Sequence, residues 1–152
     1  MIPQSFDPQR LGRYSVIRVY YEYVGQPGGE KLFIILKHKK SNQQTYCWCI
    51  KTTSQVKRFQ ADPDLLNGCV FYKAGELAFF DQDTIIDPAN FMPLLHDTLQ
   101  REATKGRYCV EGKMPDDFHQ KIVAAMRSST TLEPKKKLAL LEAIGEEFEF
   151  KA

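Results

Sequence analysis

The chain has 152 residues, of which 43% are hydrophobic and 26% are charged. This length and composition are ordinary for a single globular domain with a real core, and they argue against a disordered or fibrous chain. No apolar run approaches the length of a membrane span, and the first residues lack the basic and apolar regions of a signal peptide, so we expect a cytoplasmic protein with no membrane segment.

The positive charge is concentrated in the first part of the sequence. Residues 1–60 carry ten Lys and Arg against three acids, whereas the remainder carries eleven against sixteen. Such asymmetry is typical of a protein that presents one face to an anionic partner such as nucleic acid. A chance difference between two solvated faces is the alternative interpretation.

Four cysteines stand at positions 47, 49, 69 and 109. Zinc sites usually use C-x-x-C pairs, and that spacing is absent. The sequence therefore predicts buried free thiols in a reducing compartment, with no metal and no cofactor.

The elements up to residue 87 have the pattern of strands. Residues 1–11, with Pro3 and Pro8, form an irregular arm. β-Branched and aromatic residues with partial alternation indicate strands separated by polar or glycine-rich loops, and 58–67 is expected to be a connection with a helical turn. The expected strands are 14–23, 31–37, 46–50, 68–72, 77–86 and 107–110, and the expected loops are 24–30, a basic loop at 38–44, and 73–76.

The C-terminal part has a helical pattern. We expect a short helical turn within 88–96 and a loop at 101–106. Pro115 opens a helix whose apolar face includes Phe118 and Ile122, and a second helix ends at Gly145. The fold class is therefore α+β, mainly β with C-terminal helices, as one domain over 1–152. Its parts are the arm (1–11), a small curved antiparallel sheet or barrel (12–113) and a helical part (114–145).

Four segments, in sequence order, resemble the MazF/PemK family of toxin endoribonucleases. Residues 12–19 are similar to its opening strand, and 31–36 to its second strand. Residues 47–55 are similar to its apolar strand ending in T-[ST]-Q. Residues 77–86 contain a similar Asp-Gln pair, and 114–117 fall where the family's final helix begins.

This resemblance implies an SH3-like antiparallel barrel and metal-independent cleavage of single-stranded RNA. It also implies a type II toxin–antitoxin system, in which a homodimer is neutralised by an antitoxin protein. The sequence departs from the family at Lys31-Leu32, where the family has a functional Arg-Pro pair. Residues from about 128 onward have no counterpart in the short members.

The resemblance assigns the catalytic role to Thr53, supported by Ser54, with Lys31 in the place of the family arginine. RNA cleavage needs a deprotonated 2′-hydroxyl, a stabilised phosphorane and a protonated leaving oxygen. Thr53 would bond a phosphate oxygen or position the hydroxyl, and Lys31 would supply a point charge without the guanidinium fork. The alternatives are a strand-end turn at Thr53 and Ser54 that satisfies its own backbone, and a solvated Lys31.

A second set of residues is expected to contact RNA, mostly through phosphates. Arg18 could replace the missing guanidinium, although a salt bridge to an acid is the commoner role. Trp48 could stack on bases or belong to the core. The alternative function is a catalytically inactive barrel that binds RNA or protein, and a weaker one is an accessory protein with no RNA role. The predicted RNA-binding residues are Arg18, Lys37, His38, Lys39, Lys40, Gln55, Lys57 and Arg58.

Overall fold

The computed structural model describes residues 4–22 and 28–146. These residues form two compact units. The first contains the described residues up to Thr52 together with Phe91–Met114, and the second contains Thr53–Asn90 and the described residues from Pro115 onward. The fold class is α+β, as predicted, with antiparallel strands and C-terminal helices. Within the described stretches, no helix has the length and apolar character needed to cross a membrane.

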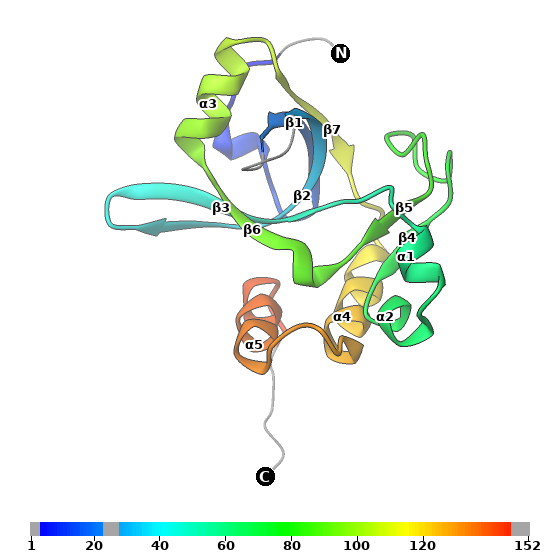
Figure 1. Ribbon diagram of the computed structural model, residues 1–152. Helices are drawn as coiled ribbons and strands as arrows, with labels where there is room; N and C mark the ends of the chain where they lie inside the picture. Colours follow the sequence, from blue (N-terminus) through cyan, green and yellow to red (C-terminus); the bar gives the residue numbers. More distant parts are fainter. Residues whose placement is uncertain (1–3, 23–27, 147–152) are drawn as a thin grey trace. The chain divides into compact units, whose positions relative to one another are not determined.

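The first unit is built on a five-stranded antiparallel sheet in the order β6-β3-β2-β1-β7. Helix α3 joins β6 to β7 and contacts β1, β3 and β7 (Figure 1). The N-terminal arm contains one short 3-10 turn, η1. The elements of this unit are η1 (Pro8–Arg10), β1 (Ser15–Tyr21), β2 (Gly29–Ser41), β3 (Gln44–Lys51), β6 (Phe91–Leu95), α3 (His96–Thr104) and β7 (Tyr108–Lys113).

Strand β2 is the centre of this sheet. Its apolar run pairs with β1 on one side and with β3 on the other, with Phe33 opposite Ile17 and Ile35 opposite Cys49. These side chains share one face because cross-strand partners project to the same side of a sheet. That face carries the core of the first unit, whose buried residues are Leu11, Ile17, Val19, Phe33, Ile35, Cys47, Cys49, Leu94, Leu99 and Tyr108.

The prediction of a basic loop at 38–44 is wrong. Residues 38–41 extend β2, Gln44 begins β3, and only Asn42 and Gln43 form the turn, with φ of 48° and 66°. Two successive left-handed residues form the type of two-residue hairpin turn whose twist matches the twist of the two strands that it joins. The polar ends of these strands lack an apolar alternation, so the sequence pattern resembles a loop. In Figure 1 the hairpin, in cyan, extends beyond the neighbouring strands of its sheet.

The prediction for residues 88–106 is wrong in part. A 3-10 turn does form at Pro88–Asn90, but a strand, β6, follows it and α3 continues through most of the expected loop. Pro93 lies in β6, which is an edge strand, where proline is tolerated because no partner needs its missing N–H. In α3 the buried Glu102 accepts hydrogen bonds from Arg107 Nε at 2.8 Å and Nη2 at 3.2 Å.

The second unit combines a two-stranded antiparallel sheet with helices. The predicted hairpin and both C-terminal helices are present, although the second hairpin strand is shorter than the expected 77–86. Gly145 ends the last helix with φ of 83°, a conformation that suits glycine. The elements are α1 (Lys57–Gln60), α2 (Pro63–Asn67), β4 (Val70–Tyr72), β5 (Thr84–Ile86), η2 (Pro88–Asn90), α4 (Phe118–Ser128) and α5 (Pro134–Ala143).

The first predicted strand is observed from Ser15 to Tyr21. Its last expected residue, 23, and most of the expected loop at 24–30 lie outside the described residues.

Truncating the centre of β2 should destabilise the first unit. Ile35 is 0% exposed, so Ile35→Ala should lower the free energy of unfolding by about 2–5 kcal/mol through lost burial and a residual cavity. The single tryptophan, Trp48, lies in the same unit and reports unfolding in urea by its fluorescence. Leu95→Ala is the control, since Leu95 is 36% exposed. Equal effects of the two substitutions would contradict this account of the core.

Candidate nucleic-acid interface

One face of the β2–β3–β6 sheet gathers cations and aromatic rings. The register places Lys37 opposite Trp48 and Lys39 opposite Tyr46, so all four side chains project to the same side. The Lys39 ammonium lies 3.8 Å from the centroid of the Trp48 ring. The Trp48 ring lies 5.8 Å, centroid to centroid, from that of Phe91 in β6. We call Lys37, Lys39, Tyr46, Trp48 and Phe91 the Trp48 face.

The Trp48 face is accessible to a ligand. Lys37 is exposed, and the other four residues are partly exposed. Cys47 and Cys49, which alternate with Tyr46 and Trp48 along β3, are buried in the core on the opposite side. Aromatic rings with interleaved cations suit single-stranded nucleic acid, because bases stack on the rings while ammonium groups contact phosphates.

Two further predicted RNA contacts, His38 and Lys40, lie at alternate positions on the opposite face of β2. Lys40 is exposed near the turn, where it can contact phosphate. His38 is half-buried, and its ring bonds to His96 and to the Leu11 carbonyl. His38 is therefore not the exposed loop histidine that the sequence suggested.

Arg18 has a carboxylate partner. Its Nε donates to Glu111 Oε1 at 2.7 Å, and the two side chains are 26% and 24% exposed. The Cys109 thiol donates to the same oxygen at 3.1 Å. Burial acts to raise the pKa of Glu111, but the hydrogen bonds from Arg18 and Cys109 outweigh it and hold that pKa below its ordinary value. The salt-bridge interpretation of Arg18 is the one that this geometry supports.

Lys31 lies at the start of β2, opposite Val19. Strand alternation places it on the same side as Phe33 and Ile35, the side that carries the core, and it is half-buried. The bulge between Ile35 and Lys37 reverses the alternation, so Lys31 and Lys37 project to opposite faces. Lys31 is therefore not part of the Trp48 face.

Thr53 belongs to the second unit, where its backbone is fixed by β5. The Thr53 amide donates to the Ile85 carbonyl at 3.0 Å, and the Ile85 amide donates to the Thr53 carbonyl at 2.8 Å. The Thr53 hydroxyl accepts from the Gln55 amide at 3.2 Å, which is the local turn considered above. A hydroxyl that accepts in this way can still donate its proton to a ligand. Ser54 and Gln55 are exposed beside it.

Lys57 and Arg58 follow on α1, also in the second unit, and both are exposed. Arg58 lies close enough to Asp87 to influence it: burial raises the pKa of the Asp87 carboxyl, and the Ala89 amide, Arg58 and Cys69 partly oppose that shift. Thr53, Ser54, Gln55, Lys57 and Arg58 thus share one short segment, whereas Lys31 belongs to the other unit.

The cysteines are all free thiols. Burial raises the pKa of Cys47 to about 12 and that of Cys69 to about 12, so neither is an activated nucleophile at neutral pH.

Comparison with known protein families gives no match, and comparison with curated proteins gives none. Assignment of a function therefore depends on the residues and their geometry.

Tyr46 and Phe91 are the residues of this interface that the sequence interpretation missed. The alternation Tyr46-Cys47-Trp48-Cys49 already separates an aromatic side from a thiol side of β3. No sequence signal links Phe91 to Tyr46 and Trp48, because the sequence predicts a short helical turn within 88–96.

The Arg18–Glu111 pair should make stability depend on pH in acid. Because the folded-state pKa of Glu111 is lowered, its contribution is fully present above the ordinary value of 4.5 and is lost as pH falls through the folded-state pKa. The difference in unfolding free energy between wild type and Glu111→Gln should therefore shrink from neutral pH to below 4.5. Urea unfolding across this range measures it, with the exposed Glu142→Gln as control. A difference independent of pH would contradict the prediction.

Proposed function

We propose that this protein is a toxin-like endoribonuclease that binds single-stranded RNA and cleaves it without a metal ion. The observation that carries the proposal is the Trp48 face, where Lys39 lies 3.8 Å from the Trp48 ring centroid and Tyr46 and Phe91 add further rings. This surface offers rings on which bases can stack and cations that can contact phosphates. Such contacts do not read the edges of the bases, and they suit a single unpaired strand. The excess of cations in residues 1–60 supports the same partner.

The cleavage step uses the RNA's own 2′-hydroxyl. Its oxygen attacks the adjacent phosphorus and loses its proton to solvent water, while the 5′-oxygen of the next nucleotide leaves and takes a proton from solvent water. The products are a 2′,3′-cyclic phosphate and a 5′-hydroxyl. The backbone of Thr53 is fixed by Ile85, and the Thr53 hydroxyl donates a hydrogen bond to a phosphate oxygen. Ser54 supports this contact. The cation is supplied by Arg58, which lies in the same unit as Thr53.

We further propose an SH3-like barrel of the MazF/PemK type. A central antiparallel sheet and a helix beginning at Phe118, after the Met114-Pro115 segment, support this comparison. By the same resemblance the protein acts in the cytoplasm as a homodimer that an antitoxin protein neutralises.

The second candidate function is RNA binding without cleavage. Lysine stands where the family has arginine, and the Arg18 guanidinium, the nearest substitute by strand position, is bonded to Glu111 at 2.7 Å. Lysine lacks the bidentate fork that holds two phosphate oxygens. RNA binding through the Trp48 face does not depend on the missing arginine.

Removing the Thr53 hydroxyl should abolish cleavage. We expect wild type to cut a varied single-stranded RNA pool in EDTA, and Thr53→Ala to be at least ~100-fold slower, the size of effect that a lost positioning or charge-stabilising group causes. Thr53→Ser should retain activity. Arg58→Ala should also slow cleavage, because Arg58 is the cation that contacts the phosphate in this proposal.

Thr52→Ala is the matched control, because the Thr52 hydroxyl donates to the Leu32 carbonyl at 3.1 Å and serves the fold. It should lower stability by about 1 kcal/mol and leave cleavage intact. Circular dichroism in the same EDTA buffer verifies that each variant is folded. Absence of cleavage by folded wild type would refute the nuclease and leave the binding module.

The Trp48 face should bind RNA whether or not the protein cuts it. Trp48→Ala should weaken the affinity for a short single-stranded RNA by about 1–3 kcal/mol, the usual contribution of one base–aromatic stack. Lys39→Ala should reduce the slope of log affinity against log salt by about 0.7, as expected for one lost phosphate contact. Fluorescence anisotropy over a salt series measures both, with the exposed Lys135→Ala as control. Unchanged affinity in both variants would exclude this face.

A further inference from the structure

Two histidines and a cysteine converge on the core side of the first unit. His38 Nδ1 lies 2.9 Å from His96 Nε2 and 3.4 Å from Cys47 Sγ. The three ligand atoms all lie within 4.8 Å of one another. Cys47 is fully buried, and both histidines are half-buried. Cys47 lies in β3, His38 lies in β2, and His96 is the first residue of α3.

The backbone carbonyl of Leu11 sets the orientation of His38. His38 Nε2 lies 2.6 Å from the Leu11 oxygen, which can only accept, so this ring nitrogen carries the proton. In the neutral ring the lone pair is then on Nδ1, which faces Cys47 and His96. Metal-binding histidines usually have this arrangement, in which one nitrogen binds the ion and the other donates to a carbonyl or carboxylate.

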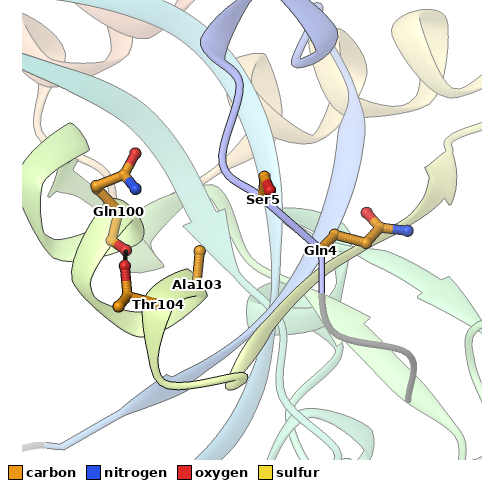
Figure 2. Close-up of a pocket in the computed structure, with 5 residues that line it drawn as sticks. All are labelled: Gln4, Ser5, Gln100, Ala103 and Thr104. Atoms are coloured by element: carbon orange, nitrogen blue, oxygen red, sulfur yellow. Dashed lines mark hydrogen bonds between the residues drawn. The ribbon is translucent and has the colours of Figure 1, made fainter.

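The N-terminal arm covers the cluster. The Phe6 ring packs edge-on against His96 at 5.1 Å and against Tyr108 at 5.8 Å, centroid to centroid. On the N-terminal side of Phe6, Gln4 and Ser5 line a pocket with Gln100, Ala103 and Thr104 of α3 (Figure 2). This packing limits the access of solvent to the cluster, which favours a bound ion over a reactive open site.

Tyr108 provides an independent observation beside this cluster. Its ring is fully buried, and its hydroxyl has no hydrogen-bond partner among the described residues. Tyr108 belongs to the same buried core cluster as Cys47, and its ring packs against Phe6, which also packs against His96. Buried hydroxyls are normally bonded, so an additional group is expected here.

We propose that His38, Cys47 and His96 bind one zinc-type transition-metal ion, which ties the β2–β3 hairpin to the start of α3. Two imidazole nitrogens and a thiolate are ligands that zinc accepts, whereas calcium and magnesium require oxygen. Bond lengths of about 2.0–2.1 Å to nitrogen and 2.3 Å to sulfur in tetrahedral geometry need ligand separations of about 3.3–3.6 Å. The observed 2.9 and 3.4 Å must therefore open by a few tenths of an ångström, and the third separation, between His96 Nε2 and Cys47 Sγ, which is at most 4.8 Å, must match the same range.

Binding has a defined proton balance. Cys47 loses its thiol proton to solvent and forms the metal–sulfur bond. His38 binds through Nδ1 and keeps its Nε2 proton on the Leu11 carbonyl. His96 binds through Nε2, with its ring proton on Nδ1. The fourth position holds a water molecule, which supplies the hydrogen-bond partner that the Tyr108 hydroxyl lacks.

The experiment measures metal content and ligand chemistry in the full-length protein without RNA. After loading with zinc and extensive dialysis, wild type should retain about one equivalent by mass spectrometry, because the proposed site holds a single ion. Cobalt loading should give a thiolate-to-metal charge-transfer band. Cys47→Ala and His96→Asn should each weaken affinity by more than the roughly 10–100-fold that loss of a supporting partner causes.

Matched controls separate the site from unspecific binding. Cys49→Ala removes a neighbouring thiol on the same strand face, one that donates to the Met92 carbonyl at 3.3 Å. His119→Ala removes the histidine of the second unit, which bonds Glu146. Both variants should retain the ion and the charge-transfer band.

The wild-type result decides the proposal even if a ligand variant fails to fold. Folded wild type that retains no zinc, or that shows no thiolate band with cobalt, would overturn it. Equal retention by Cys47→Ala and by wild type would overturn it as well. Because no RNA is present, these outcomes are independent of the cleavage assay.

Discussion

The pairing of β2 with both β1 and β3 is the constraint on which the first unit depends. Phe33 and Ile35 bring the core residues of three strands to one face, and the bulge after Ile35 sets which residues of the hairpin share that side. Beyond the bulge, His38 faces the core side and Lys37 faces the opposite side. A one-residue change in register would exchange these two sets. The hairpin register therefore positions both the Trp48 face and the His38–Cys47–His96 cluster.

The two faces of the hairpin suit different chemistry. The outer side combines ammonium groups with partly exposed rings, and the Lys39 ammonium lies over the Trp48 ring. The inner side is shielded by the arm and α3, where a thiol and two imidazoles lie close together. An exposed aromatic surface can bind a flexible polyanion, whereas a shielded cluster of soft ligands can hold an ion. Both proposals thus arise from alternation along the same two strands.

Much of the fold was predictable from local patterns. The strands at 15–21 and 44–51 and the helix after Pro115 follow from β-branched and aromatic runs and from helix-start chemistry. The extension of the hairpin, β6 and α3 were missed. Polar strand ends carry no apolar period, and Pro93 in a short run resembles a break rather than an edge strand. These elements are stabilised by tertiary pairing, which a local window does not contain.

The sequence by itself determined the α+β class, the basic first part, the burial of three of the four thiols and the hydroxyl segment at Thr53, because each depends on composition or on neighbouring residues. Only the tertiary structure decided the partners of the charged and ligating groups. Arg18 is paired with Glu111, ninety-three positions away, and His38 with His96, fifty-eight positions away. Such contacts depend on strand register and on where α3 begins. No spacing rule along the chain encodes them, which is why the cluster has no recognisable metal motif.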